Sequence, residues 1–222
     1  MSLYLPEQYD PKMSVRQTED AIKYIRDTFQ REMGREMRLS RVSAPLFVER
    51  SSGLNDNLNG VERPVSFDVP WQPDETVEVV QSLAKWKRMA LRKYGYQPGE
   101  GIYANMNAVR RDEEPDNLHS CYVDQWDWER VIRREDRNEE TLRSTASEVF
   151  RIIKHMQHEV WYKYPDACYR LPREITFIDA EELLKRYPTL TPKERENAIA
   201  RECGAVFVER IGGALSNGEP HD

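Results

Sequence analysis

The chain has 222 residues, 39% of them hydrophobic and 32% charged, as expected for a globular protein that is somewhat more polar than average. Its formal net charge of −6 at pH 7 argues against a broad nucleic-acid-binding surface. No apolar run approaches the ~20 residues that a membrane-spanning helix needs, and the N-terminus lacks a signal-peptide pattern. We therefore expect a single cytoplasmic domain over residues 1–222, without a membrane partner.

Cysteine and histidine indicate neither a disulfide framework nor a metal site. Cys121, Cys168 and Cys203 show no Cys-x-x-Cys spacing, and a reduced compartment is their simplest interpretation. His155 and His158 lie three residues apart on an expected helix, but no nearby His or Cys completes a ligand set.

The first half of the chain predicts a long helix followed by short strands. Ser14 and Gln17 form a capping-box pattern, and apolar residues then recur every three or four positions until about Arg38. The expected buried stripe comprises Ile22, Ile25, Phe29, Met33 and Met37. A strand interrupted by Pro45 follows, and the Gly-, Asn- and Ser-rich residues 51–60 should form a mobile loop. Strands over 65–69 and 76–80 precede a helix over about 82–94.

The second half begins with two β-prone segments, residues 101–110 and 120–129, which predict an antiparallel pair with a long connection. A helix over 139–164 follows. Its expected buried stripe comprises Leu142, Val149, Ile153, Met156 and Val160. A strand over 174–178, a helix, a second capped helix starting at Thr191 and a last strand over 205–213 complete the chain. This order predicts an α+β fold with an antiparallel sheet and no regular βαβ alternation.

The segment HSCYVDQWDWERVI (residues 119–132) is unusually polar for a strand. Alternation places its aromatic residues on one face, and that face can pack against helices. The opposite face comprises Cys121, Val123, Gln125, Asp127 and Glu129. A purely structural strand rarely carries an amide and carboxylates in line, so this face is a candidate binding surface.

Three features could carry chemistry. Arg110 ends one strand and faces Gln125 and Asp127 on the next, an arrangement suited to holding a phosphate beside an ammonium group. A structural Arg–Asp ion pair would explain the same pattern. The sequence does not decide between these two interpretations.

The second feature is a cluster of basic residues, Lys85, Lys87 and Arg88, at the start of a helix, where they oppose the macrodipole. They could bind a carboxylate or form a solvated basic face. The third is Asp56, in a loop that could close over a ligand with Asp56 as a base or amine acceptor. A turn capped by Asx side chains is the alternative.

The segments NDNLNGVERPVSF, SLAKWKR, GEGIYANMNAVR, LHSCYVDQWDWERV and the C-terminal GAVF…IGG…HD resemble the ammonia-dependent asparagine synthetases, or aspartate–ammonia ligases. The resemblance runs over nearly the whole chain in the right order. It implies the catalytic fold of class II aminoacyl-tRNA synthetases, an antiparallel sheet flanked by helices. It also implies a homodimer formed through the first long helix and the strand containing Pro45.

The resemblance implies that L-aspartate and ATP, with Mg²⁺, give β-aspartyl-adenylate and diphosphate. Ammonia then displaces AMP to give L-asparagine. Arg110 matches the arginine that grips the α-phosphate, and Asp112 matches a position that contacts adenine. Lys87 matches the lysine that binds the side-chain carboxylate of the substrate.

Gln125 and Asp127 match residues that hold the substrate amino group, and Asp56 lies in the loop that closes over the amino acid. Asp56 or Asp127 would accept a proton as ammonia attacks. No metal ligand is identified.

The sequence also departs from the family. Family members continue beyond Asp222 through an acidic segment and a glycine-rich third motif with a second arginine. Gln81 stands where many members have histidine, and Glu209 and Arg210 replace apolar and glycine residues, so the last strand could be altered. The alternatives are a non-catalytic fragment that binds aspartate or dimerises, and a tRNA-charging paralogue. The second is disfavoured because the chain is acidic and its first long helix begins almost at once.

Overall fold

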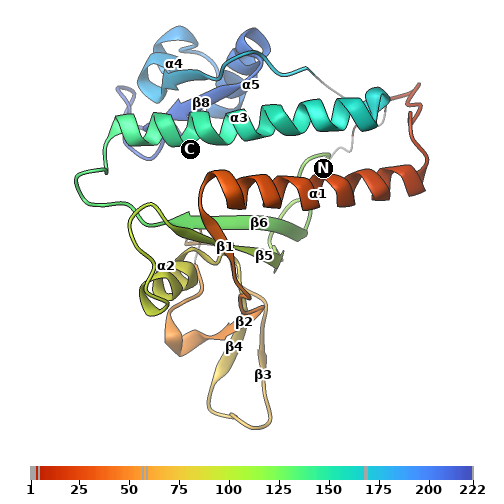
Figure 1. Ribbon diagram of the computed structural model, residues 1–222. Helices are drawn as coiled ribbons and strands as arrows, with labels where there is room; N and C mark the ends of the chain where they lie inside the picture. Colours follow the sequence, from red (N-terminus) through yellow and green to blue (C-terminus); the bar gives the residue numbers. More distant parts are fainter. Residues whose placement is uncertain (1–3, 5, 57, 59, 168–169, 222) are drawn as a thin grey trace. The chain divides into compact units, whose positions relative to one another are not determined.

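The computed structural model describes residues 4, 6–56, 58, 60–167 and 170–221, and its helices and strands have the expected α+β composition (Figure 1). The chain divides into two compact units. The first comprises Met1–Pro11 and Gln30–Arg134, and the second comprises Lys12–Phe29 and Glu135–Asp222. All of the candidate site residues belong to the first unit.

Helix α1 (Val15–Glu36) begins at the predicted capping box, where the Ser14 backbone N–H donates to Gln17 Oε1 at 2.9 Å. Its expected buried stripe is only partly correct. Met33 and Met37 are 1% exposed, but Ile22 and Ile25 are 46% and 40% exposed. The buried positions in this half of the helix are instead the smaller Ala21 and Thr28, which allow closer packing than isoleucine would.

The central sheet of the first unit has the strand order β1-β5-β6. Strands β5 (Gly101–Val109) and β6 (Tyr122–Arg130) form the predicted antiparallel pair, with Ala104 opposite Asp127 and Met106 opposite Gln125. Strand β1 (Leu39–Arg41) pairs with β5 in parallel, a pairing that the sequence did not predict. The sheet is mixed because the chain returns to β5 from a helix rather than through a hairpin.

Gly101 is required where β1, β5 and β6 come together. A Cβ atom there would lie 2.4 Å from the Glu129 carbonyl oxygen and 2.6 Å from Leu39 Cδ2. Any side chain would therefore force the strands apart.

A second small sheet, ordered β2-β4-β3, contains β2 (Phe47–Glu49), β3 (Ser66–Asp68) and β4 (Thr76–Val79), all antiparallel. A short 3₁₀ turn, η1 (Arg50–Ser52), follows β2. Helix α2 (Ala84–Lys93) follows β4. The junction between β4 and α2 packs onto one face of β5 through Val80 and Leu83, which contact a core formed by Ala104, Met106 and Ala108.

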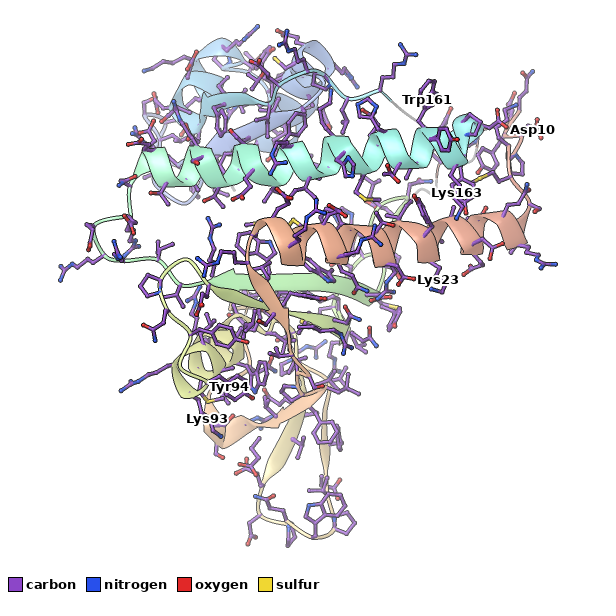
Figure 2. All side chains as sticks on the ribbon, in the orientation of Figure 1. Asp10, Lys23, Lys93, Tyr94, Trp161 and Lys163 are labelled. Carbon is purple, nitrogen blue, oxygen red and sulfur yellow. The ribbon has the colours of Figure 1, made fainter. Side chains whose placement is uncertain are left out.

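The second unit contains helix α3 (Glu139–Lys163), η2 (Pro165–Ala167), β7 (Thr176–Asp179), α4 (Ala180–Arg186), α5 (Pro192–Cys203) and β8 (Val206–Glu209). The α5 capping box of Thr191 and Glu194 forms as predicted. Strands β7 and β8 are parallel with two helices between them, an arrangement that was not expected. Near its end α3 contacts α1, where Lys163 Nζ lies 4.0 Å from the centroid of the Tyr24 ring (Figure 2).

The expected buried stripe of α3 is also only partly correct. Met156 is buried as predicted, together with Phe150 and Ile152, but Leu142 and Ile153 are 45% and 38% exposed. Within the described residues, no helix has the length and apolarity required to cross a bilayer. Cys121 and Cys203 are free thiols, and Cys168 lies outside the described part of the chain.

The altered residues of the last strand are accommodated by ion pairs. Glu209 is 5% exposed and accepts from Arg143 Nε and Nη2 at 2.9 and 2.6 Å, which lowers the pKa of Glu209 although burial opposes this. Arg210 has a φ of +61° and reaches Asp179 and Glu139 at 3.2 and 3.4 Å. The strand therefore forms with these two residues in place.

Candidate active site

A buried lysine paired with a carboxylate is the centre of the candidate site. Lys87, in the first turns of α2, is 0% exposed, and its Nζ lies 2.6 Å from Asp127 Oδ1 on β6. The ion pair is close but poorly aligned for hydrogen bonding, so Nζ has no hydrogen-bond partner among the described residues. A buried ammonium is energetically costly unless it is both paired and hydrogen-bonded. The unused N–H donors of Lys87 are therefore available to bind a ligand.

The three basic residues at this helix start have different environments. Lys85 Nζ donates to the Asn55 carbonyl oxygen at 3.1 Å, and Arg88 Nε lies 3.7 Å from Glu129 while its side chain is 70% exposed. Only Lys87 is fully buried. A solvated basic face therefore does not account for Lys87, although it describes Arg88.

The predicted polar face of β6 faces α2 and the β4–α2 junction. Residues directly opposite each other share a face, so Gln125 and Asp127 lie on the face of Met106 and Ala104, which packs against Leu83.

Arg110 lies at the far end of the same strand pair. Its backbone N–H donates to the Cys121 carbonyl oxygen at 2.7 Å, which extends the pairing of β5 with β6 by one step. Strand alternation places it on the face of Ala108, about 20 Å along β5 from the position opposite Asp127, at roughly 3.4 Å per residue. Asp127 makes its ion pair with Lys87, and Arg110 pairs with Cys121 through the backbone, so the expectation that Arg110 faces Gln125 and Asp127 across the strand pair is wrong.

The loop carrying Asp56 is anchored through its neighbour. Asn55 is 6% exposed, its Nδ2 donates to Glu78 Oε2 at 3.0 Å, and its Oδ1 accepts from the Gln81 and Asp56 backbone N–H groups at 2.9 and 3.1 Å. Arg50 Nε in turn donates to Glu78 Oε1 at 2.6 Å. Asn55 therefore fixes one point of the loop that the sequence predicts to be mobile, while Asn57 and Asn59 lie outside the described residues.

Sequence reasoning missed this anchor. Glu78 is 7% exposed within the apolar strand TVEVV, and a carboxylate in such a strand was the signal that a buried polar partner had to exist.

Three of the buried polar atoms that lack a hydrogen-bond partner in the described part of the chain belong to residues of this unit. Gln81 Oε1, Lys87 Nζ and Arg110 Nε are all buried and have no hydrogen-bond partner among the described residues. Each such atom costs about 1–3 kcal/mol, and native proteins leave few of them unexplained. A ligand that carries both hydrogen-bond donors and anionic acceptors would satisfy all three.

The carboxylate of Asp112, like that of Asp127, is already engaged. It lies between β5 and β6 and accepts from the Arg63 backbone N–H at 2.9 Å and from the Arg63 guanidinium. These hydrogen bonds lower the pKa of Asp112 to about 2. Asp112 therefore ties the β5–β6 connection to the segment before β3.

Comparison with known proteins relates this chain to one enzyme family. The sequence model described as aspartate–ammonia ligase matches residues 16–222. The aspartate–ammonia ligases of Limosilactobacillus reuteri and Limosilactobacillus fermentum are 60% and 61% identical over 223 residues. Each alignment covers 100% of this chain and 66% of the relative, so the chain spans slightly less than two thirds of the length of these curated relatives.

Solved structures support the predicted fold. The asparaginyl-tRNA synthetase of Entamoeba histolytica in complex with asparaginyl-adenylate has a TM-score of 0.63 at 10% identity, over 90% of this chain and 48% of that chain. The Pyrococcus horikoshii asparaginyl-tRNA synthetase complexed with asparaginyl-adenylate has a TM-score of 0.62 at 13% identity, over 86% and 45%. Identities this low show the fold alone, which is the class II synthetase fold expected from the sequence.

Proposed function

Because this chain belongs to the aspartate–ammonia ligase family, we propose that it amidates L-aspartate with ammonia, at the expense of ATP, through β-aspartyl-adenylate. Both compact units would serve one catalytic domain. The observation that carries the proposal is the fully buried Lys87, 2.6 Å from Asp127 and with hydrogen-bond donors to spare.

In the first step, Lys87 would bind the β-carboxylate of aspartate. An ammonium has three donors, so Lys87 can remain paired with Asp127 while it holds and orients the substrate carboxylate. Asp127 and Gln125 would accept from the substrate amino group on the same face of the sheet. The positive Lys87 would thus bind the side-chain carboxylate of aspartate, and the negative Asp127 would bind its amino group.

Arg110 would hold the α-phosphate of ATP. Attack of a carboxylate on a phosphate brings two anions together, and a guanidinium is matched to phosphate oxygens in shape and charge. Its buried Nε, without a partner among the described residues, supports this role. Asp112 remains a proposed adenine contact. It would use its backbone for this contact, because its carboxylate already binds Arg63.

In the second step, the nitrogen of ammonia bonds to the β-carbonyl carbon of the adenylate. The bond from that carbon to the phosphate oxygen breaks, and AMP leaves with the electron pair. One proton must leave the nitrogen, and Asp56 or Asp127 would accept it. With Asp56 as the acceptor, Asp56→Asn should slow asparagine formation far more than adenylate formation; with Asp127 as the acceptor, it should slow neither step selectively.

Mg²⁺ is proposed only as a companion of the ATP phosphates, because Mg²⁺ in such sites is commonly held by substrate phosphates and water with only one or two protein carboxylates. No group of three or more His, Cys, Asp or Glu in the described part of the chain could hold a metal ion. These residues therefore do not form a metal cage, and no step is assigned to the ion.

A cytoplasmic homodimer is a further part of the proposal. Ile22 and Ile25 on α1 are exposed, and so are Leu46 and Phe47, which follow Pro45. Exposed apolar residues of this kind are typical of subunit interfaces. Analytical ultracentrifugation should find a dimer in the purified chain and a shift toward monomer in Ile25→Lys.

The central experiment separates the two chemical steps. Aspartate-dependent exchange of labelled diphosphate into ATP measures adenylate formation without ammonia, and asparagine and AMP measure the complete reaction. Lys87→Met should abolish both activities, whereas Lys93→Met, a change of an exposed lysine at the end of the same helix (Figure 2), should affect neither.

A chain that binds aspartate in calorimetry but shows neither exchange nor asparagine formation would overturn the proposed enzyme in favour of a non-catalytic binding protein.

A further inference from the structure

Gln81 is a buried amide that the two steps above do not use. It lies between β4 and α2 and is 1% exposed, and its Oε1 has no hydrogen-bond partner among the described residues. Its backbone N–H is held by Asn55 Oδ1 at 2.9 Å. The backbone at this position is therefore fixed while a strong acceptor on the side chain is left unpaired.

The surroundings of Gln81 are those of the candidate site. Val80 and Leu83, on either side of it, pack on Ala104 and Met106, the β5 residues opposite Asp127 and Gln125. Asn55, which holds the Gln81 backbone, directly precedes Asp56. Gln81 thus belongs to the junction at which the Asp56 loop meets the polar face of β6.

We propose that Gln81 Oε1 holds the ammonia that attacks the adenylate, an inference that rests on the proposed ligase reaction. An unpaired, buried carbonyl oxygen needs an N–H or O–H donor, and its lack of exposure favours a donor about the size of a water molecule. Among the reactants, ammonia is the only donor of that size. The amino group of aspartate has acceptors of its own in Asp127 and Gln125.

A neutral amide suits this task. The Gln81 carbonyl accepts one N–H of ammonia and leaves the nitrogen lone pair free to form the bond to the β-carbonyl carbon. An amide has no useful basicity, so the proton released in this step goes to a carboxylate, Asp56 or Asp127. Gln81 is therefore a positioning residue that sets the orientation and local concentration of the nucleophile.

The test compares Gln81→Met, which keeps the side-chain length without the acceptor, with Gln81→His, whose neutral ring offers one acceptor nitrogen. The matched control is Gln8→Met, a change of an exposed glutamine in the same unit. Each full chain is assayed for aspartate-dependent diphosphate exchange, and for asparagine formation over a range of ammonium concentrations.

In Gln81→Met the KM for ammonium should rise about tenfold or more, equivalent to about 1.4 kcal/mol, while diphosphate exchange persists with the same KM for aspartate. Gln81→His should recover much of the loss. The inference is overturned if exchange and asparagine formation fall together, since Gln81 would then act on aspartate or on folding. It is also overturned if the KM for ammonium is unchanged, since the acceptor would then hold only water. Absence of exchange in the unmodified chain would instead refute the ligase reaction itself.

Discussion

The pairing of Lys87 with Asp127 predicts that the two residues are unequal in their effect on stability. At 2.6 Å and an effective dielectric constant of about 20, their attraction is about 6 kcal/mol, and removing both ions from water costs a similar amount. The side chain of Lys87 is 0% exposed and that of Asp127 is 31% exposed. Loss of Asp127 therefore leaves a fully buried cation without its counter-ion, whereas loss of Lys87 leaves a carboxylate that water can still reach.

We expect Asp127→Ala to lower the free energy of unfolding by about 3–5 kcal/mol, and Lys87→Met to lower it by about 1 kcal/mol. At about 2–4 °C per kcal/mol for a chain of this size, the first change lowers the melting temperature by roughly 10 °C. The double variant Lys87→Met/Asp127→Ala should return close to the original stability, because no unpaired ion remains buried.

Urea unfolding followed by circular dichroism measures these differences, with Lys93→Met as the control. Two results would refute the reasoning. One is a Lys87→Met variant less stable than Asp127→Ala, and the other is a double variant in which the two losses simply add.

Three further predictions concern the frame around the site. The depressed pKa of Asp112 means that its pairing with Arg63 stabilises the fold above about pH 4 and is lost as the pH falls toward about 2; Asp112→Asn should flatten acid unfolding curves in that range. Asn55→Ala should lower the free energy of unfolding by about 1–3 kcal/mol, because Glu78 stays buried with one partner fewer, and limited proteolysis should cleave the 51–60 loop faster. Gly101→Ala should destabilise by about 3 kcal/mol or yield insoluble protein, and a melting temperature within 2 °C of the original, about 1 kcal/mol, would contradict the close strand approach.

The features that the sequence predicted well are encoded locally. The capping boxes at Ser14 and Thr191 depend on residues three positions apart, and the β5–β6 pair depends on two adjacent alternating segments. The parallel pairing of β1 with β5 joins Leu39 to Gly101, and no local pattern reports such a distant partner.

Exposure was harder to predict than secondary structure. Apolar periodicity located the helices, but it could not distinguish a face buried within the chain from one exposed on its surface. Ile22 and Ile25 were therefore predicted to be buried, although both are exposed. Lys87 illustrates the opposite error. Its flanking Lys85 and Arg88 suggest a solvated helix face, and only the position of Asp127, 40 residues later, explains its burial.

The hydrogen bonds that run from Arg50 through Glu78 to Asn55 have a practical consequence for variant interpretation. Arg50 is 58% exposed and has no chemical role of its own, yet two hydrogen bonds through Glu78 connect it to the residue before Asp56. A substitution at this surface arginine would ordinarily be classed as harmless. Here it should shift the position of the Asp56 backbone and so change turnover, although no group proposed to touch a substrate is altered.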